Sequence, residues 1–138
     1  MNTKFTIEKN QIEVDVKATR EFYLTQNKIP KDCKCEDCEY FYNEFTNLSS
    51  KTLEQLKSFG VDLGKNLTSE PTGVWCVRDD RGEVIHIFQV YQISGKLLET
   101  NEKEFEYSNI ENGLKMNIKF LQSSLDKIDI ELTVDEIR

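Results

Sequence analysis

The chain's densest group of reactive side chains is a cysteine cluster in its first third. Cys33, Cys35 and Cys38 fall within six positions, and the fourth cysteine of the chain, Cys76, follows much later. Thiolates are common ligands in tetrahedral zinc sites, and a Cys-x-x-Cys pair often supplies two of them. The cluster therefore predicts part of a zinc site, to which either Cys76 or His86 would add the fourth ligand.

The choice of fourth ligand depends on how the hairpin turns at Asp79–Gly82. We expect a type I turn with a G1 bulge, closed by a pair between Asp79 and Glu83. This register places Cys76 opposite His86 on one face of the sheet. A two-residue loop would instead place Trp75 opposite His86 and turn Cys76 to the other face. We favour the bulge because Asp-Arg is a poor central pair for a primed turn.

The cluster also fits thiol redox chemistry. When a Cys-x-x-Cys pair opens a helix, backbone N–H groups and the helix dipole stabilise its first thiolate. For the pair Cys35 and Cys38, Lys34 would favour the thiolate, whereas Glu36 and Asp37 would oppose it and raise the thiol pKa. The residues before the pair do not form the buried strand that is usual in thioredoxin-like proteins.

A third alternative is that the cysteines are small hydrophobic residues that pack a loop against the helices. Cys76 lies in an apolar segment, which is typical of a core position. His86 is the single histidine, and a lone histidine in a strand is more often hydrogen-bonded than catalytic or metal-binding. No Ser/His/Asp arrangement can be argued from the sequence, and no glycine-rich phosphate loop is present.

Length and charge argue against several classes of function. The 138 residues include 18 Lys and Arg against 25 Asp and Glu, a net charge of −7. We therefore expect neither nucleic acid nor an anionic membrane as a partner. We find no secretory signal at the N-terminus and no apolar run of membrane-spanning length. The expectation is a cytoplasmic protein with reduced thiols.

The first half of the chain predicts a short β-segment and then helices. Residues 5–14 alternate weakly, as in a hairpin or one bent strand, and Asp15 can cap a helix that runs to about residue 26. An aromatic helix follows the cysteines. A further helix over about 50–59 carries an apolar stripe and ends at Gly60, where a left-handed residue is expected.

The second half predicts β-strands. Residues 84–93 are apolar on both alternating sets, as in a central strand that is covered on both faces. Ser94-Gly95 is expected to end this strand. Two strands flank Asn112-Gly113, a strong hairpin dipeptide, and residues 128–132 form the last strand.

Helices first and strands second predict one α+β domain over residues 1–138. Its helical part is expected at about 15–64 and its sheet part at about 73–133. We expect an N-terminal β-α segment, a Cys-rich loop and a helical pair packed on an antiparallel sheet of about five strands.

Part of this pattern resembles a family of small uncharacterised bacterial proteins. The most specific part is the Cys-x-Cys-x-x-Cys cluster followed by Tyr40-Phe41, and the turn at 59–62 is similar to the family's Leu-Gly-Ile-Asp. The other matching residues are Tyr23, Ile29, Pro30, Leu56, Lys65, Glu70 and Gly95. Lys31-Asp32 depart from the family, in which the chain turns directly into the first cysteine, and the family's proline near Lys65 is missing. The resemblance covers about 14–98, implies a bacterial cytoplasmic protein and brings no activity with it.

These patterns predict a non-enzymatic binding module whose partner is a protein. Its cysteine loop is then structural, zinc is its candidate cofactor, and the expected ligands are Cys33, Cys35, Cys38 and Cys76, with His86 as the alternative fourth. The alternative function is a thiol redox enzyme or sensor that uses Cys35 and Cys38. The oligomeric state does not follow from the sequence.

Overall fold

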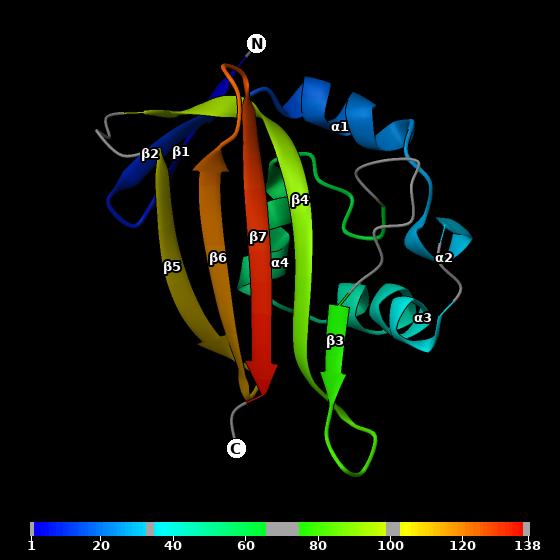
Figure 1. Ribbon diagram of the computed structural model, residues 1–138. Coiled ribbons are helices and arrows are strands. Elements are labelled where there is room, and N and C mark those ends of the chain that lie inside the picture. Colours follow the sequence, from blue (N-terminus) through cyan, green and yellow to red (C-terminus); the bar gives the residue numbers. More distant parts are fainter. Residues whose placement is uncertain (1, 33–34, 66–74, 99–102, 137–138) are drawn as a thin grey trace.

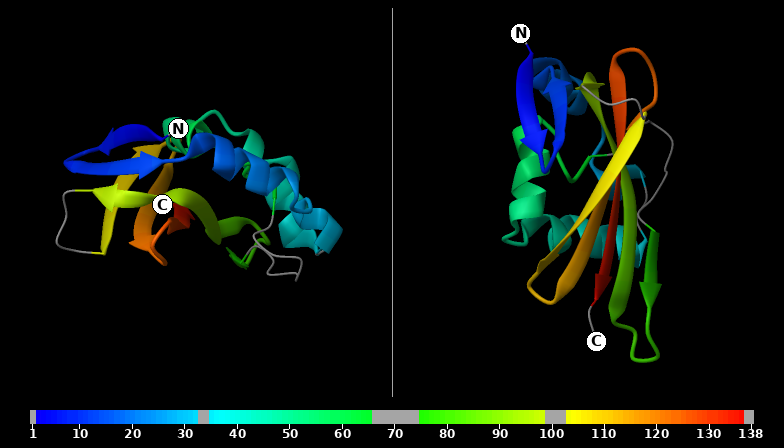
Figure 2. Two further views of the ribbon diagram at one scale, coloured as in Figure 1. Left: turned by 90° about the horizontal axis from the view of Figure 1, so that it is seen from above. Right: turned by 90° about the vertical axis from the view of Figure 1, so that its left-hand side faces the viewer.

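The computed structural model describes residues 2–32, 35–65, 75–98 and 103–136. Its helices are α1 (Val16–Leu24), α2 (Ile29–Asp32), α3 (Glu36–Asn43), the 3₁₀ helix η1 (Phe45–Asn47) and α4 (Lys51–Ser58). Its strands are β1 (Thr3–Ile7), β2 (Asn10–Val14), β3 (Trp75–Arg78), β4 (Val84–Leu98), β5 (Glu104–Glu111), β6 (Leu114–Gln122) and β7 (Lys127–Glu136). The helices lie together on one side of a curved sheet (Figures 1 and 2).

The sheet is organised around β4, its longest strand. The strand order is β1-β2-β4-β7-β6-β5, and every pairing is antiparallel. One edge of β4 pairs with β7, whereas the other edge pairs with β3 near its start and with β2 near its end. β4 therefore joins the N-terminal hairpin and the β3–β4 hairpin to the rest of the sheet.

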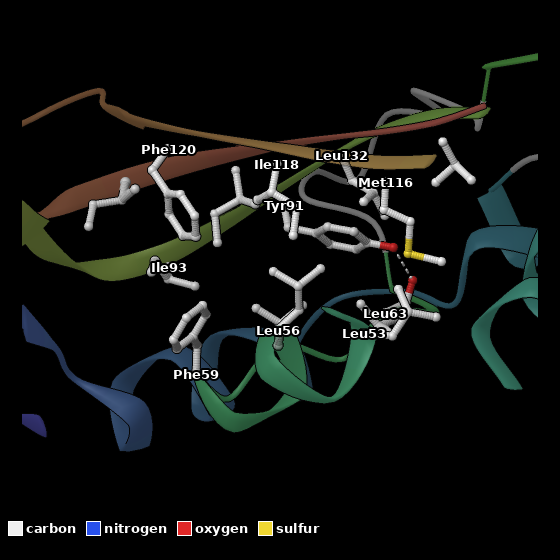
Figure 3. Packing of buried hydrophobic residues seen from close by; sticks show 14 of the residues in the cluster. Leu53, Leu56, Phe59, Leu63, Tyr91, Ile93, Met116, Ile118, Phe120 and Leu132 are labelled. Atoms are coloured by element: carbon white, nitrogen blue, oxygen red, sulfur yellow. Dashed lines mark hydrogen bonds between the residues drawn. The ribbon is translucent and has the colours of Figure 1, made fainter. Parts of the chain in front are cut away.

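The core lies between the sheet and α4 (Figure 3). Side chains alternate between the two faces of a strand, and one set from β4, β6 and β7 is buried against the helices. On the helix side, α4 and the residue after it present Leu53, Leu56 and Phe59 at helical spacing, each 0% exposed. The residues of β4, β6 and β7 that contribute to the core are Ile87, Tyr91, Ile93, Met116, Ile118, Phe120, Ile128, Ile130, Leu132 and Val134.

Helix α4 begins at a side-chain cap that β5 reinforces and ends at a glycine. The Ser50 side chain caps the helix by accepting a hydrogen bond from the Leu53 N–H at 3.2 Å. A carboxylate from β5, that of Glu111, accepts the N–H of Lys51 at 2.7 Å. Gly60 follows the helix with a φ of 97°, which confirms the expected left-handed residue.

The expected combination of helices and an antiparallel sheet is confirmed, but the sheet is larger than expected. Seven strands occur in the described residues rather than about five, because the hairpin β1–β2 joins the same sheet. The expected break at Ser94-Gly95 is wrong, since β4 continues through it to Leu98. A Cβ on Gly95 would lie 2.2 Å from the Glu13 carbonyl oxygen, so the glycine permits close approach of β2 instead of ending the strand.

No described helix combines the length and the apolar character that crossing a membrane requires.

Candidate functional site

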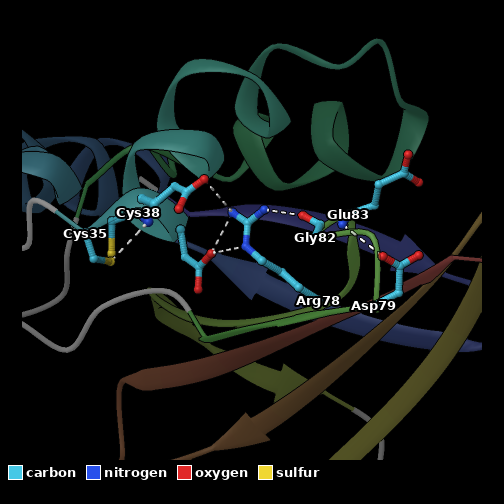
Figure 4. A network of polar contacts seen from close by, with 8 residues as sticks. Cys35, Cys38, Arg78, Asp79, Gly82 and Glu83 are labelled. Atoms are coloured by element: carbon cyan, nitrogen blue, oxygen red, sulfur yellow. Dashed lines mark hydrogen bonds and ion pairs between the residues drawn. The ribbon is translucent and has the colours of Figure 1, made fainter.

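The cysteine pair that the sequence singled out opens α3. Cys35 is the N-cap of this helix, and its Sγ accepts a hydrogen bond from the Cys38 N–H at 3.3 Å (Figure 4). Cys35 is exposed, whereas Cys38 is completely buried among the core side chains. One sulfur therefore faces solvent and the other packs inside. Cys33 lies outside the described residues, so the structure does not place this member of the cluster.

An arginine connects the start of α3 to the β3–β4 hairpin. The Nε and Nη2 atoms of Arg78 lie 2.9 Å and 2.8 Å from Oδ1 of Asp37, in the first turn of α3. The Nη1 atom of Arg78 donates to the Gly82 carbonyl at 2.7 Å (Figure 4). One planar guanidinium thus binds the helix and the hairpin turn together.

Cys76 lies on the helix side of the sheet, as Cys35 and Cys38 do. It is partly buried, pairs with the buried Ile87 on β4, and shares its face of β3 with Arg78. Burial, the Asp37 charge and, more weakly, the Cys35 thiol raise the pKa of Cys76 to about 11, against the opposing effect of Arg78. Strand β3 therefore brings the distant cysteine towards the start of α3, a placement that sequence spacing could not determine.

The turn of the hairpin is the expected bulged turn. The Asp79 N–H donates to the Glu83 carbonyl and the Gly82 N–H to the Asp79 carbonyl, both at 2.9 Å. Gly82 has a φ of 81°, the left-handed conformation that a G1 bulge requires.

The expected pairing of Cys76 with His86 is nevertheless wrong. A second irregularity shifts the register between Val77 and Arg78, so that Val77 pairs with His86 and Cys76 with Ile87. His86 consequently points to the face away from the helices. There its Nδ1 lies 2.5 Å from Oδ1 of Asp135 on β7. His86 therefore does not share a face with the cysteines, and its assignment as alternative fourth ligand is not supported.

The described residues contain no group of three or more His, Cys, Asp or Glu side chains placed to hold a metal ion. Within the same residues, Cys35, Cys38 and Cys76 form no disulfide. A four-thiolate site would also need Cys33, which the structure does not describe. The zinc ligand set Cys33, Cys35, Cys38 and Cys76 therefore stays a prediction.

The far side of the sheet carries a second candidate surface, which we name the open sheet face. It comprises Trp75, Val77, His86, Phe88, Val90, Glu131, Thr133 and Asp135. Trp75 and Val77 are 62% and 37% exposed, and the Trp75 ring meets the His86 ring edge-on with 5.7 Å between centroids. An exposed tryptophan beside other apolar side chains is unusual on a surface that contacts only water.

The apolar character of this surface was visible in the sequence, but its exposure was not. Both alternating sets of residues 84–93 are apolar, from which we expected cover on both faces. In the described residues the helices cover only one face, and Phe88 and Val90 on the other face remain half-buried. The second apolar set of β4 is therefore left uncovered by the described helices.

Comparisons with known proteins found no matching family model, no matching curated protein and no matching solved structure. The resemblance to small bacterial proteins stays a prediction that rests on the residues quoted for it.

Proposed function

We propose that this chain is a cytoplasmic, non-enzymatic module that binds a protein partner on its open sheet face. The observation that carries the proposal is the exposure of Trp75 beside Val77 and the half-buried Phe88. Tryptophan is the residue type most enriched at binding hot spots, since its large ring loses much water contact on docking.

The charges around this apolar centre define the complementary partner. Asp129, Glu131 and Asp135 follow one another on the open side of β7. On β6, Lys119 pairs opposite Glu131 and Lys115 opposite Asp135. Lys119 is also engaged by Glu104 at 3.2 Å, and Lys127 by the Ser94 hydroxyl at 2.8 Å. The partner that fits is a protein surface with an apolar centre and a basic rim, which also suits the net charge of −7.

The test compares two substitutions of exposed apolar residues. Trp75→Ser should abolish binding of a partner purified with the wild-type protein, whereas Leu125→Ser should leave it unchanged, since Leu125 is 90% exposed in the loop after β6. Binding should also shield Trp75, the single tryptophan, from iodide quenching. A partner that binds Trp75→Ser as tightly as wild type, or that leaves quenching unaltered, would refute the proposal.

We further propose that zinc fastens the cysteine loop, with Cys33, Cys35, Cys38 and Cys76 as ligands. The supporting observation is that β3 places Cys76 on the same side of the sheet as the α3 cysteines, while Arg78 fastens these elements together. Protein purified without chelator or histidine tag should contain about one zinc per chain, and Cys76→Ser should lower this content. Metal-free wild-type protein with four reactive thiols would refute it.

A second candidate function is thiol redox chemistry, favoured by the exposed Cys35 sulfur and its hydrogen bond from the Cys38 N–H. In this case the two thiols form a disulfide by giving two protons and two electrons to glutathione disulfide, which becomes two glutathione molecules. Mass spectrometry after incubation with glutathione disulfide should then show a Cys35–Cys38 bond. An unmodified Cys35 after prolonged incubation would remove this candidate.

A further inference from the structure

A groove lies on the helical side of the molecule, away from the open sheet face. It is bordered by α1, α3, η1, the end of α4 and the turn Gly60–Gly64, and its volume is about 480 Å³. This volume falls within the range of pockets that take small molecules. Its lining includes neither a cysteine nor a residue of the open sheet face.

The floor of the groove includes two backbone N–H groups that have no acceptor among the described residues. Val61 and Leu63 are 4% and 3% exposed, yet neither backbone N–H donates a hydrogen bond within the described part of the chain. By contrast, the Gly64 N–H donates to Oδ1 of Asp62 at 3.1 Å. Buried N–H groups are rarely left unpaired, so an acceptor other than the described residues, either water or a ligand oxygen, is expected beside these two.

The turn that carries these donors is held in place by the core. The Tyr91 hydroxyl donates to the Leu63 carbonyl at 2.8 Å (Figure 3). A Cβ on Gly64 would lie 2.7 Å from the Tyr42 ring, so the backbone packs directly against α3. The donors therefore sit on a fixed segment, which lowers the entropic cost of binding.

The lining of the groove includes an arginine side chain that can meet an anion. Arg20 on α1 is exposed and forms no ion pair or hydrogen bond with the described residues, and Lys57 on α4 lies 3.3 Å from Glu54. The single acid in the lining is Asp62, whose Oδ1 is already occupied by the Gly64 N–H. Lys57 is therefore paired with Glu54, and Arg20 is the lining cation that has no carboxylate partner among the described residues.

We propose that this groove binds the phosphate or carboxylate group of a small anionic molecule. The Arg20 guanidinium attracts the charge, and the Val61 and Leu63 N–H groups donate to its oxygens. The amide side chains of Asn43 and Asn47, also in the lining, are available to polar groups on the rest of the molecule. A nucleic-acid chain is a poor candidate, since the protein as a whole is acidic.

The test is an NMR titration of ¹⁵N-labelled protein with inorganic phosphate and, separately, with succinate. The amide signals of Gly60, Val61, Leu63 and Gly64 should shift and saturate with at least one anion. Arg20→Gln should weaken that binding by roughly tenfold, the expected loss for one charge-assisted contact. Arg81→Gln is the matched control, since it removes one exposed arginine from the hairpin turn.

The titration has results that support anion binding and results that refute it. Saturable local shifts with phosphate alone, with succinate alone or with both support the proposal and name the preferred group. The proposal fails if neither anion shifts these amides at concentrations of tens of millimolar, or if Arg81→Gln weakens binding as much as Arg20→Gln. The spectra of both variants report whether the fold is retained. The result is independent of the partner test, because Trp75 pairs with Phe88 and so lies on the face of the sheet away from the helices.

Discussion

At the scale of single residues, Glu111 is a cap supplied to a helix from a distant strand. Its carboxylate accepts hydrogen bonds from the Ser50 hydroxyl and the Lys51 N–H, both at 2.7 Å, and from the Thr52 N–H at 3.2 Å. These contacts satisfy donors that the first turn of α4 cannot pair internally. Glu111→Gln should therefore lower the free energy of unfolding by about 1–2 kcal/mol at neutral pH, as urea denaturation would measure.

The same contacts predict a dependence on pH. Partial burial alone would raise the pKa of Glu111, but the hydrogen bonds from Ser50, Lys51 and Thr52 outweigh it and lower the pKa to about 2. Because the folded pKa is below the unfolded value, the stabilisation is complete above about pH 4.5 and is lost as the pH falls towards 2.

The stability difference between wild type and Glu111→Gln should therefore shrink between about pH 5 and about pH 3. Glu21→Gln, on the exposed side of α1, serves as the control that should show little difference at either pH. A difference for Glu111→Gln that stays constant over this interval would contradict the proposed cap.

At the scale of elements, the β3–β4 hairpin shows which structural details local sequence determines. The turn was predictable because Asp and Gly occupy the positions where a type I turn with a G1 bulge needs them. The second irregularity, beside Val77, was not predictable. Both alternating sets of β4 are apolar, so a one-residue shift in register exchanges one apolar set for the other and leaves no sequence signal. That shift decides that Cys76 and His86 face opposite sides.

The link between α3 and this hairpin depends on the geometry of a guanidinium. Arg78 reaches Asp37 with two nitrogens and the Gly82 carbonyl with a third, which a lysine ammonium cannot reproduce. Arg78→Lys should therefore lower the urea midpoint almost as much as Arg78→Ala does. In a double-mutant cycle, Asp37→Asn and Arg78→Lys should be non-additive. Arg81→Lys is the control, and strict additivity of the first pair would exclude the proposed link.

Gly95 allows the backbones of β2 and β4 to approach closely where these two strands pair. A Cβ at this position would meet the Glu13 carbonyl oxygen at 2.2 Å, and a backbone atom cannot move aside without disturbing the pairing. Gly95→Ala should therefore cost about 1–3 kcal/mol in calorimetric stability. Gly113→Asn should cost less than about 1 kcal/mol, since Asn tolerates a φ of 75° and nothing lies within 4 Å of a Cβ there. Equal costs would contradict the crowding argument.

At the scale of the whole molecule, the sequence predicted the helices and the strands. It did not predict how much of the sheet the helices cover. Apolar periodicity located α4 and the strands of the sheet, because a core needs one apolar face on each. It could not show that the second apolar set of β4 is uncovered by the described helices, since a buried face and a partner-binding face have the same residue types. Residues 5–14 were expected to form a hairpin or one bent strand, and they form the hairpin β1–β2. Its place beside β4 depends on the close approach at Gly95.

Phe59 is the residue through which these layers are joined into one cooperative structure. Its ring contacts Phe5 on β1 and Phe120 on β6, with centroid separations of 4.9 Å and 6.2 Å, and its side chain is fully buried at the end of α4. Phe59→Ala should therefore cost about 3–5 kcal/mol, whereas Phe88→Ala, half-buried on the open sheet face, should cost less than about 2 kcal/mol.

Far-UV circular dichroism should follow this comparison in urea, because the exposed Trp75 changes its surroundings little on unfolding. Amide hydrogen exchange tests whether the N-terminal hairpin and the rest of the sheet unfold together. Since Phe59 connects the N-terminal hairpin to α4 and β6, Phe59→Ala should speed exchange of the β1–β2 amides together with those of β6. Accelerated exchange in β1–β2 alone would show instead that the hairpin opens as an independent unit.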